Sequence, residues 1–168
     1  MTKNNLNGTV KTKHGNRTIT LRDRAEIANK NHADLAVSIH DDDSQPWETF
    51  AQVYIQEVGL HRDTASGKQI KFTNKEVAEK SKKYGTIFAK ERTKEEKHKV
   101  TIVRNSFNGR AGLSPGNLST VQLLAEVPWV YGEVGARGKL TNKQMDQYAK
   151  GIIAGVEASV PTKGKTLP

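Results

Sequence analysis

The sequence contains no cysteine, which excludes a disulfide framework, a cysteine-ligated zinc ribbon and a thiol nucleophile. It also has no run of about 18 apolar residues, so no membrane-spanning helix is predicted. The first ten residues, MTKNNLNGTV, lack an apolar stretch and do not resemble a signal peptide. Because exported and cytosolic proteins can both lack cysteine, this absence leaves the redox compartment open.

The chain does have the length and apolar content of one folded domain. Its 168 residues are 35% hydrophobic, and a chain of this length buries roughly 68–70% of its unfolded surface. The sequence shows no internal repeat and no linker long enough to divide it. We therefore expect a single domain over residues 1–160, followed by a short polar tail at 161–168.

Positive charge is in excess and is unevenly distributed. Lysine and arginine together number 27 against 18 acidic residues, a net charge of +9. Residues 62–104 alone hold 13 basic and 6 acidic residues, a net of +7. Such a segment attracts polyanions, such as nucleic acid, teichoic acid or an acidic membrane surface. A solvated helix face is the favoured interpretation, because the segment lacks the recognisable motifs of nucleic-acid-binding domains.

Short β-like runs alternate with helical patterns, which indicates an α/β fold. The first half begins with two brief extended segments, Gly8–Thr12 and Thr18–Leu21, and a helix that a capping box at Thr20–Asp23 opens and that ends near Asn31. The run Leu35–Ile39 predicts a strand buried on both faces. A second strand is predicted at Phe50–Val58 and a loop at residues 59–72.

The second half predicts two helices separated by strands and a loop. A capping box at Thr73–Glu76 opens a basic helix whose apolar face carries Val77, Ser81, Tyr84 and Phe88. The pattern then predicts a strand at Val100–Val103 and a loop at Asn105–Gly116. A further strand is predicted at Val127–Tyr131, with Pro128 at the start or edge of this strand. The last helix opens with a box at Thr141–Gln144 and has the apolar stripe Met145, Tyr148, Ala149, Ile152, Ile153 and Val156.

Two polar residues follow apolar runs, at the strand ends where open α/β sheets collect ligands. His40 directly follows Leu35–Ile39, and Glu133 follows Val127–Tyr131 after one glycine. Each alone is more often a solvated or hydrogen-bonded residue, but zinc hydrolases combine an imidazole on the metal with a carboxylate on the attacking water. We expect Ser38 and His40 to point to opposite faces of their strand, which argues against a Ser–His couple. The block Asp41–Asp43 is interpreted as a solvated loop rather than a calcium site.

The order of these segments resembles the zinc-dependent N-acetylmuramoyl-L-alanine amidases of the family 3 type. Residues 21–29, LRDRAEIAN, and 33–40, ADLAVSIH, match the helix and strand end at which that family presents a zinc-binding histidine. Residues 124–135, LAEVPWVYGEVG, match the strand that delivers its catalytic glutamate. The run VKTKHGNRTITL at 10–21 and the segment from Ala136 through Val156 match the parts before and after, so the likeness extends over about residues 10–158.

The resemblance implies an α/β fold of the phosphorylase/hydrolase-like kind, with a mixed twisted sheet flanked by helices. It further implies zinc as cofactor, with His40 as a metal ligand and Glu133 as the catalytic base. The implied activity is hydrolysis of the peptidoglycan amide between N-acetylmuramic acid and L-alanine, in an extracellular, cell-wall or periplasmic location. Residues 1–160 are then an amidase catalytic-type domain, and the basic segment would help hold it on an anionic wall.

The resemblance leaves a gap at the N-terminus. Family members open with a strand carrying a Gly-His-Gly zinc ligand and a helix region carrying a glutamate ligand, and neither has a counterpart here. We therefore expect the family's N-terminal strand and helix to be missing, and His14 is not expected to replace a ligand. Two interpretations stay open: a zinc-dependent amidase, or an inactive truncated amidase-like protein that binds cell wall or regulates a complete amidase. A nucleic-acid-binding domain ranks below both, since it rests on charge alone.

Overall fold

The computed structural model describes residues 9–12, 15–104 and 116–160. The tail predicted at 161–168 lies outside these residues, as do His14 and nearly all of the loop predicted at 105–116. In chain order the elements are β1 (Thr9–Thr12), β2 (Gly15–Thr18), α1 (Leu21–Lys30), β3 (Ala36–Asp42), β4 (Ala51–Ile55), β5 (Gly59–Asp63), β6 (Gln69–Phe72), α2 (Lys75–Glu96), β7 (Thr101–Arg104), β8 (Gly116–Leu118), α3 (Thr120–Leu124), β9 (Trp129–Gly135) and α4 (Asn142–Ser159).

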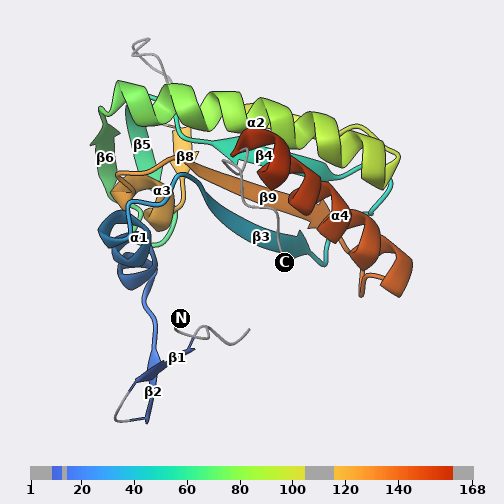
Figure 1. The fold of residues 1–168 in the computed structure, drawn as a ribbon, viewed down its shortest axis with the longest axis horizontal. Helices are drawn as coiled ribbons and strands as arrows, with labels where there is room; N and C mark the ends of the chain where they lie inside the picture. The colour runs from blue at the N-terminus through green and yellow to red at the C-terminus, as the bar shows by residue number, and fades with distance from the viewer. Residues whose placement is uncertain (1–8, 13–14, 105–115, 161–168) are drawn as a thin grey trace, which may run out of the picture.

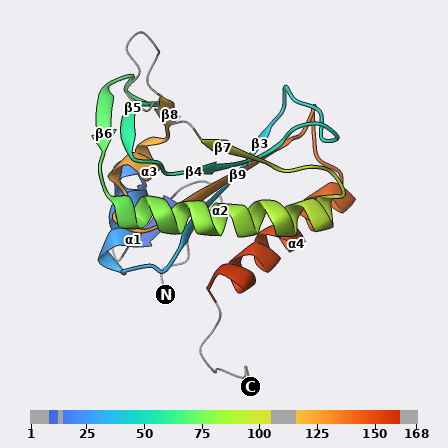
Figure 2. The ribbon, with the colours of Figure 1, turned by 90° about the horizontal axis from the view of Figure 1, so that it is seen from above.

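The main sheet is mixed, which confirms the predicted fold class. Its strand order is β3-β9-β4-β7. The pairs β3–β9 and β4–β7 are parallel, and β9 runs antiparallel to β4. Figures 1 and 2 show α2 and α4 side by side on one face of this sheet, and Figure 1 shows the β1–β2 hairpin apart from it, below α1. No helix of the described residues is long and apolar enough to cross a membrane.

A second, three-stranded sheet occupies the segment where a loop was expected. Strands β5 and β6 form an antiparallel hairpin within residues 59–72, and β8 adds to β5 in parallel. The prediction of a loop was wrong because Gly67, with φ of 68°, closes a tight turn between the two strands. Asp63 fastens this turn to α3: its carboxylate accepts from the Ala65 amide at 3.2 Å and from the Thr120 hydroxyl at 2.5 Å.

The helix starts are set by side-chain caps, two of them as predicted. Thr20 and Thr141 form complete capping boxes with Asp23 and Gln144. The box predicted at Thr73 is wrong: Asn74 is the N-cap of α2 and accepts from the Val77 amide at 3.1 Å. An Asn caps well because its short side chain reaches the orphan amides of the first turn.

Helices α2 and α4 pack closely because glycines line their contact. A Cβ at Gly151 would lie 2.9 Å from the Cα of Arg92, and one at Gly155 would lie 2.8 Å from the Phe88 ring. The apolar stripe predicted for α4 is therefore buried only in part. Tyr148 and Ile152 lie in the core, while other members stay exposed, namely Met145, Ala149, Ile153 and Val156.

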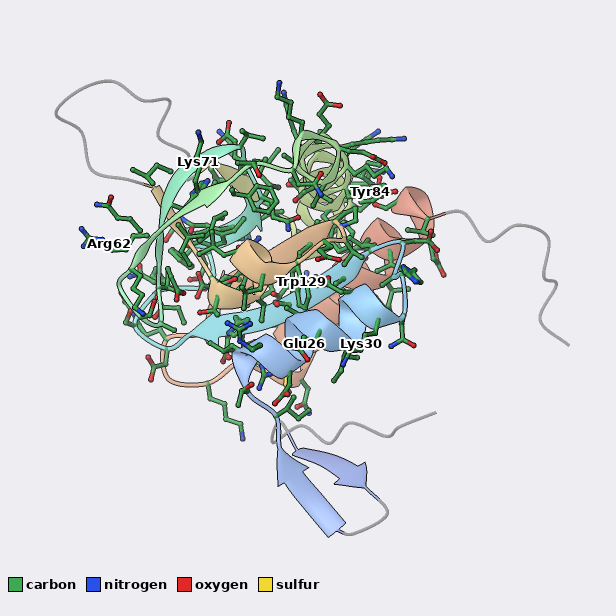
Figure 3. The ribbon with its side chains drawn as sticks, turned by 90° about the vertical axis from the view of Figure 1, so that its left-hand side faces the viewer. Glu26, Lys30, Arg62, Lys71, Tyr84 and Trp129 are labelled. Atoms are coloured by element: carbon green, nitrogen blue, oxygen red, sulfur yellow. The ribbon has the colours of Figure 1, made fainter. Side chains whose placement is uncertain are left out.

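Strand β3 is an edge strand rather than the doubly buried strand predicted from its apolar run. It pairs with β9 alone among the described strands, and Ile39 is 60% exposed. The neighbouring strand fits its prediction better, because Pro128 precedes β9 and its carbonyl accepts from the Ala36 amide at 2.9 Å. Figure 3 labels Trp129, the first residue of β9, in the middle of the molecule, with Glu26 and Lys30 on the outer face of α1.

Candidate active site

The sheet brings His40 and Glu133 side by side. They are register partners in the parallel pair β3–β9, and Gln52 of β4 is the partner of Glu133 on its other side. His40, Glu133 and Gln52 thus form one row across three strands, and the register aligns a second row of three residues two positions away along each strand. Because side chains alternate along a strand and Val130 and Val134 face the helices, both rows lie on the opposite face. The six residues are Ser38, Tyr131 and Tyr54 in one row and His40, Glu133 and Gln52 in the other.

Two details of the sequence-based expectation are corrected here. Ser38 and His40 share a face, because they are two residues apart on one strand. The Ser38 hydroxyl is occupied, however, since it accepts from the indole Nε1 of Trp129 at 2.8 Å. In addition, His40 and Glu133 lie within β3 and β9 rather than after their ends.

The acidic block after His40 also differs from the solvated loop expected there. Asp41 and Asp42 continue strand β3. Asp42 accepts from the amide and the hydroxyl of Ser44, at 2.9 and 2.6 Å. These hydrogen bonds lower the pKa of Asp42. The block therefore ends the strand in a turn.

A pocket of about 620 Å³ opens over this face of the sheet. Helix α1, the segment around α3 and the hairpin turn at Thr64 contribute its walls, and the sheet forms its floor. Its lining residues are Leu21, Arg24, Ser38, His40, Tyr54, Thr64, Val103, Ser119, Val121, Gln122, Tyr131 and Glu133. Such a mixture of aromatic, apolar and convergent polar side chains in a cavity of this size is typical of a binding site for a small molecule.

His40 is held by stacking on one side and by a backbone tether on the other. Its ring lies 4.4 Å from the Tyr131 ring, centroid to centroid, at an interplanar angle of 12°. The Tyr148 hydroxyl donates to the His40 carbonyl at 3.2 Å from the helix face. Partial burial lowers the pKa of His40, the Glu133 carboxylate opposes this shift, and the Arg24 guanidinium adds to it. The imidazole is therefore neutral at pH 7, the form that accepts a proton or binds a metal.

Glu133 receives a hydrogen bond from a neutral phenol. The Tyr54 hydroxyl donates to Glu133 Oε2 at 3.1 Å and also contacts the Gln52 side-chain oxygen. Burial, followed by the charge of Glu133, raises the pKa of Tyr54 above its usual range, so the hydroxyl stays protonated and remains a donor. The same two causes raise the pKa of Tyr131 to about 12. The carboxylate is thus oriented by the hydrogen bond at Oε2 in the lining of the pocket.

On the face of the sheet that the helices cover, Arg92 and Tyr148 hold the backbone of the strands that carry His40 and Glu133. Arg92 of α2 donates to the carbonyls of Gln52 at 2.8 Å and Glu133 at 3.2 Å. Its guanidinium lies 4.5 Å from the centre of the Tyr148 ring, and Tyr148 in turn holds His40. Rigid support of this kind keeps site residues in one geometry.

The side chains around His40 do not by themselves fit a catalytic zinc. Such an ion takes three protein ligands and one open position. Among the residues that the structure describes, no group of three His, Cys, Asp or Glu side chains is placed to hold a metal. Beside His40 this pocket offers one carboxylate, Glu133, and otherwise tyrosines, serines, a glutamine and the cationic Arg24.

Sequence reasoning predicted His40 and Glu133 as site residues, which the structure places side by side, but it missed the residues that surround them. Arg24 and Tyr131 lie within the segments that carry the family resemblance, yet neither was assigned a role. Tyr54 carried no local signal, because only the β4–β9 register brings it to Glu133. Arg92 belongs to the basic segment for which the sequence favours a solvated helix face, but its side chain is fully buried.

Comparison with known proteins finds a matching family model and solved structures of similar fold. Residues 2–158 match the family model described as N-acetylmuramoyl-L-alanine amidase. The chain has no match among the curated protein sequences. Its fold is similar to that of an N-acetylmuramoyl-L-alanine amidase from Clostridium difficile 630, with a TM-score of 0.51 and 18% identity over 91% of this chain and 72% of that one.

Two mycobacterial structures share the fold as well. For the N-acetylmuramyl-L-alanine amidase from Mycobacterium smegmatis the TM-score is 0.55 at 17% identity, covering 90% of this chain and 65% of that one. For the apo enzyme from Mycobacterium abscessus it is 0.53 at 18% identity, covering 89% and 65%. The chain therefore spans 65–72% of the length of these three structures.

Proposed function

The chain belongs to the N-acetylmuramoyl-L-alanine amidase family, and from this we propose that it acts on peptidoglycan and hydrolyses the amide between N-acetylmuramic acid and L-alanine. The membership confirms the resemblance inferred from the sequence. The observation that carries the proposed activity is the pairing of His40 with Glu133 on adjacent strands over one pocket. A cell-wall location follows from the substrate.

In this proposal Glu133 is the general base. Its carboxylate takes a proton from the water that attacks the amide carbonyl and passes it to the departing amine of L-alanine. Tyr54 holds the carboxylate in place, and the neutral His40 ring forms the adjacent wall of the pocket. We assign no step to zinc, because the described side chains do not supply its ligand set.

Purified peptidoglycan tests the proposal. The wild-type chain should release stems that begin with a free L-alanine amine, detected by mass spectrometry. Glu133→Gln should lower the rate by about 10²–10⁴-fold, the usual contribution of a general base. The control is Glu126→Gln, which changes an exposed carboxylate outside the pocket. Equal rates for Glu133→Gln and wild type would remove Glu133 from the mechanism.

A second candidate is binding without hydrolysis, and the incomplete metal-ligand set favours it. This is the inactive, wall-binding or regulatory form of the family that the sequence also suggested. It predicts that the chain co-sediments with peptidoglycan but releases no L-alanine termini, with or without added Zn²⁺. Detectable, Glu133-dependent release would eliminate this candidate.

The basic segment adds a partner to either candidate. Exposed lysines follow one another along α2 and its C-cap, and several of them have no acidic partner among the described residues, namely Lys75, Lys82, Lys83, Lys90 and the C-cap Lys97. We propose that they strengthen attachment to anionic wall polymers. Such attachment weakens with added salt, because exposed charges are screened. Wall binding that is unchanged between about 0.05 and 0.5 M NaCl would contradict this part.

A further inference from the structure

Arg24 is the one permanently charged cation among the twelve residues that line the pocket. It belongs to α1, is exposed, and makes no ion pair with any acid in the described part of the chain. A guanidinium left without a carboxylate partner inside a cavity is a ready-made site for an anion.

The helix that carries Arg24 is held firmly against the rest of the site. The Arg24 amide donates to the carbonyl of the N-cap Thr20 at 3.2 Å, which fixes the first turn. Farther along α1, Asn29 donates to the Leu124 carbonyl at 3.1 Å and accepts from the Glu126 amide at 2.8 Å. The guanidinium is therefore attached to a positioned element, which reduces the ordering cost of binding a ligand there.

The pocket is polarised, with one cation and one carboxylate at different places. Glu133 is its single acidic lining residue. Arg24 of α1 and Glu133 of β9 therefore bring opposite charges into one pocket from two different elements. A ligand with one negative group is therefore attracted toward Arg24 and repelled from Glu133, which fixes its orientation.

We propose that Arg24 binds the free carboxylate of the residue that follows L-alanine in the peptidoglycan stem. This inference rests on the proposed function, which places the muramoyl–alanine amide at Glu133. The next stem residue then lies one residue farther on, about 3.3–3.6 Å along an extended chain, within reach of the pocket that Arg24 also lines. The substrate class is accordingly stems whose second residue is an unamidated D-glutamate, in preference to stems in which that carboxylate is an amide.

A matched pair of ligands tests this assignment. The γ-methylamides of N-acetylmuramoyl-L-alanyl-D-glutamate and N-acetylmuramoyl-L-alanyl-D-isoglutamine differ only in a free α-carboxylate against an α-carboxamide, because the γ-carboxyl of each is blocked as it is in a longer stem. Their affinities are measured by calorimetry in a Glu133→Gln background, so that neither ligand is consumed. We expect the glutamate form to bind about tenfold more tightly, because a charge-assisted pair is replaced by a neutral one.

Arg24→Gln should abolish the preference while leaving the affinity for the isoglutamine form within about twofold. The control is Arg22→Gln, which removes a neighbouring exposed guanidinium that does not line the pocket and should keep the preference. Equal affinities for the two ligands, or a preference that persists in Arg24→Gln, would overturn the assignment. Circular dichroism of each variant confirms that α1 is intact.

The same measurements separate this inference from the proposed activity. A wild-type chain that hydrolyses neither ligand but still prefers the glutamate form refutes hydrolysis and supports Arg24. Hydrolysis of both ligands at equal efficiency supports the activity and refutes Arg24. Binding of neither ligand refutes both.

Discussion

Replacement of Arg92 by methionine should destabilise the fold severely, because it removes the centre of a buried network. The side chains of Arg92 and Glu96 are both 0% exposed. Two guanidinium–carboxylate contacts join them, at 2.5 Å from Nε and 3.1 Å from an Nη atom. The same guanidinium satisfies the carbonyls of Gln52 and Glu133 and lies over the Tyr148 ring.

The expected loss is about 3–5 kcal/mol of unfolding free energy. Methionine fills a similar volume, so the main cost is that the Glu96 carboxylate stays buried without its guanidinium partner, next to the His98 ring at 3.5 Å. The two carbonyls that lose their donor add to this cost. With a urea m-value of about 2 kcal/mol per molar, the midpoint should fall by roughly 1.5–2.5 M.

The assay is urea unfolding of Arg92→Met followed by tryptophan fluorescence, with two companion variants. Arg92→Met/Glu96→Leu removes both charges and should recover most of the loss, because no buried charge is left unpaired. Lys94→Met breaks the exposed ion pair with Glu91 and should cost no more than about 1 kcal/mol. A loss below about 1 kcal/mol for Arg92→Met, or a double variant as unstable as the single one, would refute the reasoning.

Three further predictions follow from other parts of the structure. Gly135→Ala should cost about 1–3 kcal/mol in thermal or urea unfolding, because its Cβ would lie 2.3 Å from the Pro46 carbonyl oxygen; full stability would contradict this packing. The pKa of Tyr131 is raised to about 12 against about 10 in an unfolded chain, so the unfolded state loses its proton first and stability falls as pH rises above about 10. Urea midpoints at pH 8 and pH 10.5 should therefore differ more for wild type than for Tyr131→Phe, and equal slopes would argue against the shift. The described residues offer His40 no pair of further ligands, so a calorimetric titration with Zn²⁺ should show no site that His40→Ala abolishes; one zinc per chain that this change removes would mean that ligands outside the described residues complete a site.

Local signals in the sequence predicted the starts of two helices and the positions of several strands. The Thr20 and Thr141 boxes are confirmed because a cap is a contact between residues three positions apart, which a sequence displays directly. The strands at 51–55 and 101–104 are likewise close to the predicted runs. The division of the chain at residue 160 stays a prediction.

The wrong predictions concern features that depend on neighbours distant in sequence. The hairpin within 59–72 has weak alternation and gains stability from packing against β8 and α3, more than 40 residues away. The apolar run of β3 suggested burial on both faces, but burial depends on which strands stand beside it. The sequence predicts one continuous apolar stripe on α4, but only the side of the helix that carries Gly151 and Gly155 packs against α2.

The sequence by itself determined the family and the α/β class, because these are written in contiguous motifs, and it predicts His40 and Glu133 as site residues. Only the tertiary structure decided that the two residues are register partners and that Tyr54, Tyr131 and Arg24 surround them. It also decided that Arg92 is a buried clamp rather than a surface charge. The physical reason is that strand register and helix packing join residues from separate segments, and no local periodicity records which segments will meet.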